Sequence, residues 1–351
     1  AIAVATGRAA EMGLLFRKGT ALEALARADT VVLDKTGTLT RGKPTLVRVL
    51  PFGLSQEEAL RLAAALERGS EHPLAKAVLE AAESLPQAQA EEVRALPGEG
   101  VEGRVEGRRL HLGGPALMER LGVPLPEEAK ALPEEGYTPL YLVEGTRLLA
   151  AFAVFDPPRP EAQEAVAALK ALGLKLVLLT GDHPAPARRV AEALGIPEVL
   201  AGVRPEGKVE AIRRLQAEGR KVVFVGDGIN DAAALAQADV GLAMGSGTDI
   251  ALEAGDVVLL TPDLRGVVNA VRLARRTLRT IYLNFFWAYA YNVVLIPVAA
   301  GALYPFTGLL LNPMLAAAAM SLSSLFVLTN SLRLRAFRPQ ALPSLNPAAS
   351  S

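Results

Sequence analysis

Five polar side chains stand at or near the ends of short apolar runs, where they could act together in catalysis. Asp34 ends the first run, Thr180 follows the second, and Asp227 and Asp231 follow the third. Lys208 lies near the start of a helical pattern between the second and third runs. Because the carboxyl ends of neighbouring parallel strands meet at one edge of a sheet, we expect these side chains around a common crevice.

This combination of side chains suits phosphoryl transfer. The carboxylate of Asp34 is ionised at pH 7 and can attack phosphorus without a separate base. Its charge repels the incoming phosphate, so cations must compensate. We expect Asp34 and Asp227 to hold Mg²⁺, while Lys208 and Thr180 neutralise and hydrogen-bond the phosphoryl oxygens.

The elements that must position these residues alternate along the chain. Residues 31–34, 175–179 and 221–225 have the apolar composition of buried parallel strands. Residues 160–172 and 206–217 have helical patterns. Strands that alternate with helices predict a doubly wound α/β fold with a parallel sheet.

A long interval separates the first strand from the second and holds elements of a different kind. Residues 55–68 and 73–84 read as amphipathic helices, and residues 101–112 and 140–154 read as hairpins. We therefore expect a separate α+β unit, residues 45–152, inserted into the sheet domain.

Charge and cysteine content exclude several classes of function. The 351 residues carry 37 Lys+Arg and 37 Asp+Glu, and the chain has no cysteine. A formal net charge of zero argues against nucleic acid as a partner. The absence of cysteine excludes disulfides, zinc ribbons and cysteine nucleophiles within this chain.

No charged residue occurs between Arg279 and Arg333. About 20 apolar residues span a bilayer, so we expect two membrane helices, residues 281–303 and 309–332, in contact with membrane lipid. Arginines flank both outer ends, which places these ends in the cytoplasm. The alternative is a buried helical hairpin of a large soluble protein.

Four segments together resemble the signature motifs of P-type ATPases, whose catalytic domain has a haloacid-dehalogenase-like fold. Residues 34–40 read Asp-Lys-Thr-Gly-Thr-Leu-Thr and match the phosphorylation motif. Residues 180–182 and 226–231 match the Thr-Gly-Asp and Gly-Asp-Gly-x-Asn-Asp motifs, and residues 156–159 resemble the Asp-Pro-x-Arg hinge. The resemblance implies an aspartyl phosphate at Asp34. The catalytic residues that it implies are Asp34, Lys35, Thr36, Thr180, Gly181, Asp182, Lys208, Asp227, Asn230 and Asp231, with Mg²⁺ on Asp34, Thr36 and Asp227.

Thr36 separates this chain from the related soluble phosphatases. Those enzymes place an acid–base Asp two positions after the nucleophile, where this chain has Thr36, which cannot activate water. The resemblance therefore implies a phosphoenzyme that persists until another group hydrolyses it, as an ion pump requires.

Two segments of the inserted unit resemble the nucleotide site of heavy-metal-transporting P-type ATPases. Residues 70–74 read Ser-Glu-His-Pro-Leu, and residues 98–100 read Gly-Glu-Gly. Taken alone, His72 could instead be a helix cap or a core residue. Gly114 departs from the asparagine that is usual in the family, so no side chain can act there. The ATP contacts that the resemblance implies are Glu67, His72, Gly98, Gly100, Gly113 and Gly114.

Residues in the apolar stretch resemble signatures of the Cu(I)-transporting subclass, namely Tyr291, Asn292, Met320 and Ser324. Met320 and Ser324 are four residues apart and share one face of a helix; taken alone, either could be packing. The subclass also has a Cys-Pro-Cys motif, which we expect upstream of Ala1. The earlier spans and the actuator domain would then be missing partners within the same polypeptide, and a copper chaperone is a further possible partner.

The resemblance implies ATP-driven export of Cu(I) across the cell membrane, with cytoplasmic catalytic domains; this chain would be the C-terminal catalytic part. The alternatives are a P-type ATPase for another heavy metal, a membrane-anchored phosphatase of the haloacid dehalogenase class, and a non-enzymatic nucleotide-binding regulator. The expected bounds are 1–23 (end of a membrane helix and linker), 24–44 and 153–262 (phosphorylation domain), 45–152 (nucleotide-binding domain), 263–280 (connecting helix), 281–303 and 309–332 (membrane helices), and 333–351 (cytoplasmic tail).

Overall fold

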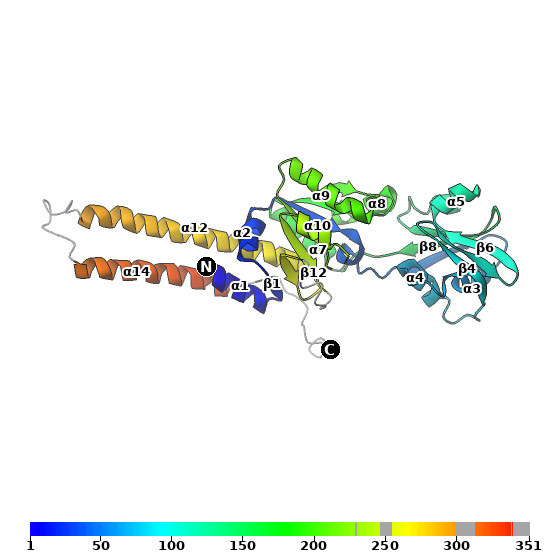
Figure 1. The fold of residues 1–351 in the computed structure, drawn as a ribbon, viewed down its shortest axis with the longest axis horizontal. Helices are drawn as coiled ribbons and strands as arrows, with labels where there is room; N and C mark the ends of the chain where they lie inside the picture. The colour runs from blue at the N-terminus through cyan, green and yellow to red at the C-terminus, as the bar shows by residue number, and fades with distance from the viewer. Residues whose placement is uncertain (229, 246–254, 300–312, 338, 340–351) are drawn as a thin grey trace. The chain divides into compact units, whose positions relative to one another are not determined.

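The computed structural model describes residues 1–228, 230–245, 255–299, 313–337 and 339 (Figure 1). Contacts divide the chain into two compact units. The first unit comprises Ala1–Val32, Glu164–Leu176 and Glu206–Ser351, and the second comprises Leu33–Gln163 and Val177–Pro205. The domain bounds expected from the sequence stay a prediction, because these units are defined by contacts alone.

A seven-stranded sheet carries the reactive strand ends. Its strand order is β1-β13-β12-β11-β2-β9-β10. The strands are β1 (Leu14–Phe16), β2 (Thr30–Asp34), β9 (Lys175–Leu179), β10 (Glu198–Leu200), β11 (Val222–Asp227), β12 (Val240–Met244) and β13 (Val257–Leu259). The pairs β9–β10, β11–β12 and β12–β13 are parallel, as the sequence predicts. Strand β1 pairs antiparallel with β13, so residues from the expected linker form an edge of this sheet.

The three strands expected from the sequence are all present, and their apolar composition explains their place in the sheet. Every residue of β2 is buried, and β12 is buried throughout. Parallel strands covered on both faces require such continuous apolar runs. Strand β11 extends two residues further than expected and ends at Asp227 itself.

Helices occupy the connections between these strands. The unit that includes β11 contains α9 and α10, both of which contact β11, and α2, which contacts β12. The helices associated with the sheet are α1 (Ile2–Glu11), α2 (Gly19–Arg27), α7 (Ala162–Ala171), α8 (Pro184–Leu194), α9 (Lys208–Ala217) and α10 (Ala232–Gln237), with a short turn η2 (Pro205–Gly207) before α9.

A second sheet is built from the interval between the first two reactive strands. Its six strands have the order β3-β8-β7-β6-β5-β4, and all neighbouring pairs are antiparallel. The strands are β3 (Thr45–Pro51), β4 (Ala90–Leu96), β5 (Gly100–Val105), β6 (Arg108–Gly113), β7 (Thr138–Glu144) and β8 (Arg147–Phe155). The expected hairpins correspond to β5–β6 and β7–β8.

Two apolar cores pack against this second sheet, one on each face. Successive residues of a strand point to opposite faces, and the central strands bury both sets. One core joins the sheet to α3 (Gln56–Glu67) and α4 (Pro73–Ala81) around Leu62 and Phe152. The other joins it to α5 (Pro115–Leu121) and α6 (Glu127–Lys130) around Leu117 and Tyr141.

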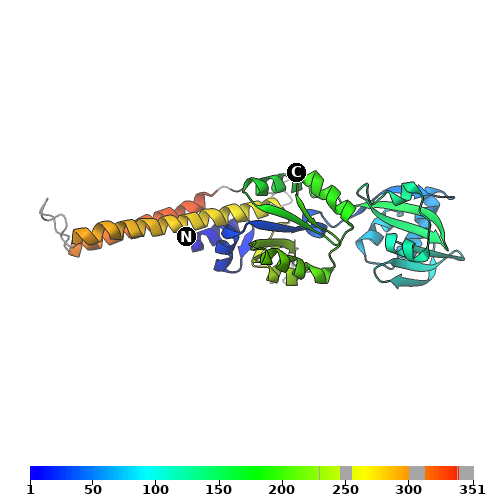
Figure 2. The same ribbon diagram turned by 90° about the horizontal axis from the view of Figure 1, so that it is seen from above.

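Two helices, α12 (Arg265–Ala299) and α14 (Pro313–Leu332), run side by side (Figures 1 and 2). The expected connecting helix and first span form one continuous helix, α12. Asn284 of α12 donates to Ser331 of α14 at 3.0 Å, and Asn330 donates to Asn284 at 2.8 Å. Within the described residues, no helix combines the length and the apolar character needed to cross a membrane. The end of the first expected span, the start of the second and most of the expected tail lie outside the described residues.

Candidate functional site

Asp34 ends the buried strand β2 and is itself almost fully buried. The chain then turns through η1 (Lys35–Leu39), where Gly37 has a positive φ of 79°. Glycine adopts this conformation without the steric cost that a side chain would impose. The turn closes when the Thr40 N–H donates to the Lys35 carbonyl at 2.9 Å.

Asp156 and Arg159 brace this turn from a distant part of the sequence. The Thr40 hydroxyl donates to Asp156 Oδ2 at 2.7 Å, and Arg159 Nε donates to the Thr38 carbonyl at 2.8 Å. The second carboxylate oxygen of Asp156 and the hydroxyl of Thr38 are buried with no hydrogen bond among the described residues. The hinge motif therefore fixes the backbone that follows Asp34.

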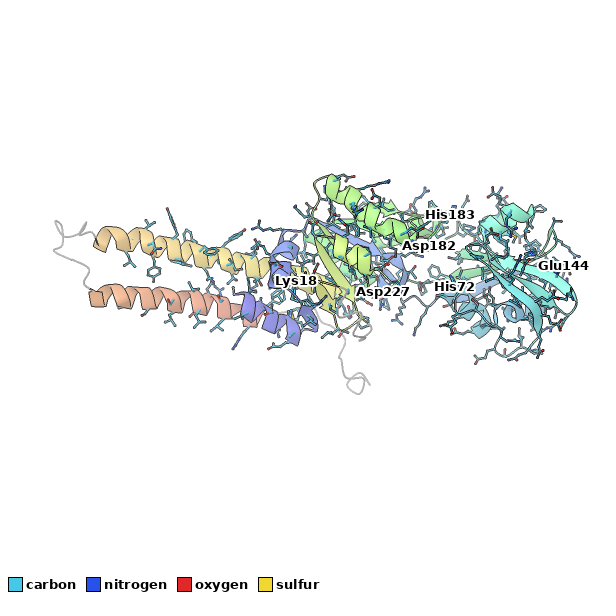
Figure 3. The ribbon with its side chains drawn as sticks, viewed as in Figure 1. Lys18, His72, Glu144, Asp182, His183 and Asp227 are labelled. Carbon is cyan, nitrogen blue, oxygen red and sulfur yellow. The ribbon has the colours of Figure 1, made fainter. Side chains whose placement is uncertain are left out.

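Lys35 forms an ion pair with Asp182, a residue of the segment after β9. Figure 3 labels Asp182. The Asp182 N–H donates to the Thr180 hydroxyl at 3.1 Å, and Thr180 is buried. Gly181 lies between them; a Cβ there would come within 3.2 Å of the Val203 carbonyl oxygen. The structure thus brings Lys35, Thr180 and Asp182 together, in the same unit as Asp34 and Thr36.

The other half of the predicted set lies in the other unit and forms its own network around Asp231. The Asp227 N–H donates to Asp231 Oδ2 at 2.9 Å, and Lys208 Nζ donates a hydrogen bond to Asp231 Oδ1 at 2.8 Å. Asn230 Nδ2 donates to Asp227 Oδ2 at 3.1 Å. The Asp231 side chain is 1% exposed, so its charge is compensated within the protein. Asp227, labelled in Figure 3, is half-buried.

Lys208 therefore has a structural partner that the sequence does not reveal. From the residue types we expect its ammonium to neutralise a phosphoryl group, and in the structure it also neutralises Asp231. No local pattern predicts this pair, because the two residues are 23 positions apart, with the rest of α9 and strand β11 between them. A lysine in such a pair is held in place before any substrate arrives.

Glu67 is the last residue of α3, the helix that packs against the inserted sheet, and 8% of its surface is exposed. Burial raises the pKa of its carboxyl group to about 7, because an apolar surrounding disfavours the ionised form. A carboxyl group that is partly protonated at neutral pH can donate as well as accept a hydrogen bond. This property suits contact with a nucleotide base better than a fully ionised carboxylate would.

His72 caps helix α4 through Nδ1, which accepts the Leu74 N–H at 3.1 Å (Figure 3). This capping role is the structural alternative to nucleotide binding that the sequence leaves open for His72. It fixes the ring, however, and directs the proton of the neutral imidazole to Nε2, which stays available as a donor on an exposed side chain. A capping role and a nucleotide contact are compatible at this residue.

The four glycines of the expected nucleotide site differ in their structural roles. A Cβ on Gly100 would lie 2.1 Å from the Leu112 carbonyl oxygen, and one on Gly113 would lie 2.2 Å from the Glu99 carbonyl oxygen. Gly98 has a φ of 75°, in the region that favours glycine. A Cβ on Gly114 would meet nothing within 4 Å. Close approach of β5 and β6 therefore requires Gly100 and Gly113 irrespective of any ligand.

Arg120 belongs to the same region and was not singled out from the sequence. Its Nε donates to Glu99 Oε2 at 2.6 Å and so ties α5 to the loop between Gly98 and Gly100. The residues of this pair are 21 positions apart and follow no periodic pattern, so only the fold reveals it.

The residues expected to bind the transported metal lie on the paired helices. Tyr291 and Asn292 belong to α12, and Ser324 and Met320 belong to α14. Asn292 and Ser324 are exposed, and the side chain of Met320 lies outside the described residues. The structure thus places these residues on neighbouring helices without testing their role.

The family follows from comparison with known proteins. The family model for haloacid dehalogenase-like hydrolases matches residues 28–239, so the chain belongs to that family. This match confirms the expected α/β fold, and its bounds run from just before β2 to just before β12.

Within that family the chain is similar to P-type ATPases, as its motifs predict. It is 51% identical to "Copper-transporting ATPase 1" of Rhizobium meliloti, over 96% of this chain and 42% of the relative. It is 44% identical to "Probable copper-transporting ATPase PacS" of Synechococcus elongatus, over 97% of this chain and 46% of the relative. The chain thus spans less than half the length of these curated relatives.

Solved structures show the same relationship. A zinc-transporting PIB-type ATPase in its E2·Pi state matches 95% of this chain and 54% of its own, with a TM-score of 0.75 and 38% identity. The catalytic domain of the CPx-ATPase CopB-B matches 77% of this chain and 98% of its own, with a TM-score of 0.61 and 29% identity.

Proposed function

We propose that this chain is the C-terminal catalytic part of an ATP-driven exporter of Cu(I), in which Asp34 carries the phosphoryl group. The observation that carries the proposal is Asp34 at the end of a buried strand, followed by a braced turn, in a chain 51% identical to a copper-transporting ATPase.

The proposed reaction is an in-line displacement at the γ-phosphorus of ATP. An oxygen of Asp34 attacks, the bond between phosphorus and the β–γ bridging oxygen breaks, and ADP leaves with the electron pair. Lys35 and Thr180 are held beside the nucleophile's turn by Asp182, and we propose that they stabilise the charge on the phosphoryl oxygens. Thr36 carries no acid–base group, so the aspartyl phosphate persists.

The resemblance assigns Mg²⁺ to Asp34, Thr36 and Asp227, and their chemistry fits it. Among the described residues, no three His, Asp or Glu side chains gather to hold an ion. Mg²⁺ commonly needs only one or two carboxylates and takes its other ligands from phosphates and water. When bound, the ion neutralises the charge between the carboxylates and the phosphoryl group. The hydrogen bond from Asn230 orients the Asp227 carboxylate for this purpose.

ATP itself is proposed to bind at the inserted sheet, with contacts from Glu67, His72 and the backbone of the four glycines. The raised pKa of Glu67 and the fixed ring of His72 support this assignment, because each offers a donor to a nucleotide base. Gly114 offers backbone only.

We further propose that α12 and α14 lie in the cell membrane, with the catalytic domains in the cytoplasm. Large apolar side chains are exposed on both helices, and no charged residue occurs between Arg279 and Arg333. These side chains are Phe285, Phe286, Tyr289, Val294, Leu322, Leu325 and Leu328.

The earlier spans and the actuator domain of the parent polypeptide, and a copper chaperone, are further proposed partners. The 38% identity to a zinc-transporting pump makes another heavy metal the second candidate cargo.

The phosphoenzyme provides the direct test. The full-length parent, incubated with radiolabelled ATP and Mg²⁺, should form an acid-stable phosphoprotein that hydroxylamine cleaves, because acyl phosphates have this reactivity. Asp34→Ala should abolish the label, whereas Asp29→Ala, an acidic residue on the same segment, should retain it. Label that survives Asp34→Ala would overturn the assignment. Rapid loss of label without the actuator domain would favour the phosphatase alternative.

A further inference from the structure

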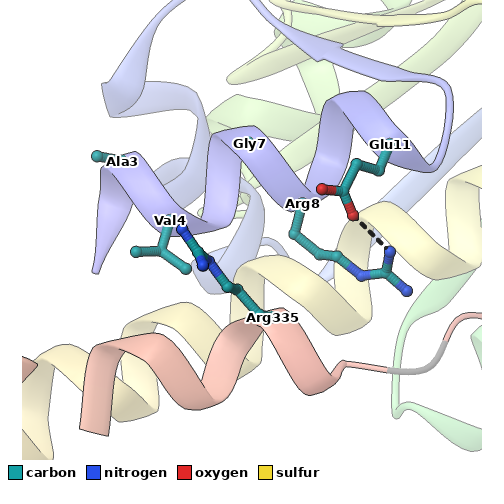
Figure 4. A pocket seen from close by; sticks show the side chains of 6 residues that line it. All are labelled: Ala3, Val4, Gly7, Arg8, Glu11 and Arg335. Carbon is teal, nitrogen blue, oxygen red and sulfur yellow. Dashed lines mark hydrogen bonds and ion pairs between the residues drawn. The ribbon is translucent and has the colours of Figure 1, made fainter. Parts of the chain in front are cut away.

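An open hollow of about 690 Å³ lies between helix α1 and η3 (Arg333–Ala336), the turn that follows α14. Both elements belong to the same unit. The residues that line the hollow are Ala3, Val4, Gly7, Arg8, Glu11 and Arg335 (Figure 4). None of them belongs to the phosphoryl-transfer or nucleotide residues described above.

Small side chains keep this hollow open. Ala3 and Gly7 are exposed, and a Cβ on Gly7 would meet nothing within 4 Å. Val4 adds a half-buried apolar surface one turn before Arg8 on the same helix. The hollow therefore has an apolar part near the start of α1 and a charged part further along it (Figure 4).

The charged part carries a net positive charge of one. Arg8 pairs with Glu11 at 2.8 Å, but the Glu11 side chain is 68% exposed, and such a pair contributes little in water. No described carboxylate forms an ion pair with Arg335, which is exposed and reaches toward Val4 (Figure 4). A singly charged anion would neutralise this net positive charge.

Arg8 is held in position to take part. Its Nε and Nη2 donate to the Phe337 carbonyl at 3.2 and 2.9 Å, and Phe337 is itself buried beneath Arg272, 5.4 Å from the ring centre. The contacts to Phe337 and Glu11 use three of the five N–H donors of the guanidinium, and two remain for a ligand. The fork geometry of these donors suits phosphate oxygens.

The surroundings indicate which anion fits. The hollow lies where α14 ends, and Arg275, Arg276, Arg279 and Arg333 also flank the uncharged part of the helix pair. Basic pockets at the cytoplasmic ends of apolar helices bind the headgroups of anionic lipids. Val4 and the exposed apolar side chains of α12 and α14 would accommodate acyl chains, which a free phosphate lacks.

We propose that this hollow binds the phosphodiester of an anionic lipid through Arg335 and Arg8. The proposal rests on the proposed membrane location of α12 and α14. It is independent of phosphorylation, because no residue of the hollow belongs to the catalytic set. Lipid of this kind would link α1 to the turn after α14 and so stabilise the base of the helix pair.

The test measures lipid retention by the purified chain in a neutral detergent, without ATP or copper. Native mass spectrometry should show more phosphatidylglycerol than phosphatidylcholine of the same acyl length. Arg335→Gln should weaken retention of phosphatidylglycerol about tenfold, since it removes a charge-assisted hydrogen bond to the phosphodiester within the hollow. Arg333→Gln removes the same charge from the same turn but does not line the hollow, and it should change retention less than twofold.

Two further arms make the outcome decisive. Gly7→Leu fills the hollow and keeps both arginines, so lipid retention should fall. Helix content should not fall, because leucine favours the helix more than glycine does. Equal retention of the two lipids, equal effects of Arg333→Gln and Arg335→Gln, or displacement of lipid by equimolar inorganic phosphate would each overturn the proposal. Asp34→Ala should leave lipid retention unchanged, so failure of this inference is distinct from failure of the proposed pump.

Discussion

The buried carboxyl group of Glu67 makes the stability of the inserted sheet depend on pH. Its pKa is about 7 in the folded protein and about 4.5 when exposed, so the folded state holds its proton more tightly. The stabilisation is present below pH 4.5 and is lost as the pH rises through 7. The upper limit of this effect is about 3 kcal/mol, from a shift of roughly two and a half pKa units.

We therefore expect Glu67→Gln to remove part of the pH dependence of unfolding. Urea midpoints measured between pH 5 and pH 8 should fall more for the natural chain than for the variant, because glutamine has no proton to lose. Glu80→Gln, at an exposed position of α4, is the matched control and should follow the natural chain. Parallel curves for the natural chain and Glu67→Gln would contradict the raised pKa.

The ion pair between Lys208 and Asp231 gives a second prediction about single residues. Lys208→Ala leaves a carboxylate that is 1% exposed without its cation, and we expect a loss of about 3–5 kcal/mol in the free energy of unfolding. Arg214→Ala removes a cation from the same helix whose side chain is 79% exposed, and should cost less than about 1 kcal/mol. Chemical denaturation measures both values. A neutral Lys208→Ala would show that solvent, not Lys208, compensates Asp231.

The sequence predicts the reactive residues better than it predicts their partners. Asp34 ends its strand, as expected, and Asp227 ends a strand that we expected to stop two residues earlier, because strand positions follow from local apolar patterns. The pair of Lys208 with Asp231 and that of Arg120 with Glu99 depend on how distant elements fold together. No local pattern encodes such pairs, so only the structure reveals them.

Among the elements, the β5–β6 hairpin depends on two glycines whose role can be separated from nucleotide binding. Gly113→Ala would force a methyl group to within 2.2 Å of the Glu99 carbonyl oxygen, so we expect a loss of about 1–3 kcal/mol or more in stability. Gly114→Ala places its methyl group in open space and should be tolerated. Thermal unfolding of both variants without ATP provides the measurement. Equal midpoints would show that β5 and β6 do not approach so closely.

Two elements differ from the sequence expectation for identifiable reasons. Strand β1 has only three residues, too few to show a period, and it exists because its antiparallel pairing with β13 completes a sheet edge. Helix α12 is continuous because no proline or glycine interrupts it between Val267 and Leu295. The change from charged to apolar residues near Arg279 suggests a boundary in the sequence. Backbone hydrogen bonds do not depend on this change, so the helix continues through it.

At the scale of the whole molecule, the sequence predicts the architecture because its local signals agree. Alternating strands and helices indicate the seven-stranded sheet, and alternating hairpins in the long interval indicate the antiparallel sheet. The order of strands, with β2 between β11 and β9, cannot be read from periodicity. Only the structure reveals this order.

The identity of the transported ion is the prediction that involves the parent protein as a whole. Met320 offers a thioether, a soft neutral ligand that favours Cu(I) and Ag(I) over harder divalent ions. Tyr291, Asn292 and Ser324 add only neutral oxygen donors. A zinc pump would be expected to keep an ionisable residue at such depth, and none occurs between Arg279 and Arg333.

We therefore expect Cu(I) and Ag(I), and not Zn²⁺, to stimulate ATP hydrolysis by the full-length parent in lipid vesicles. Met320→Ala should abolish most of this stimulation and leave ATP binding intact, because the nucleotide contacts lie in the inserted sheet. Met314→Ala removes the same thioether six residues earlier, on a different face of α14, and should retain stimulation. Equal stimulation by Zn²⁺, or loss of stimulation in both methionine variants, would contradict the copper assignment and leave the zinc-transporting relative as the better guide to the cargo.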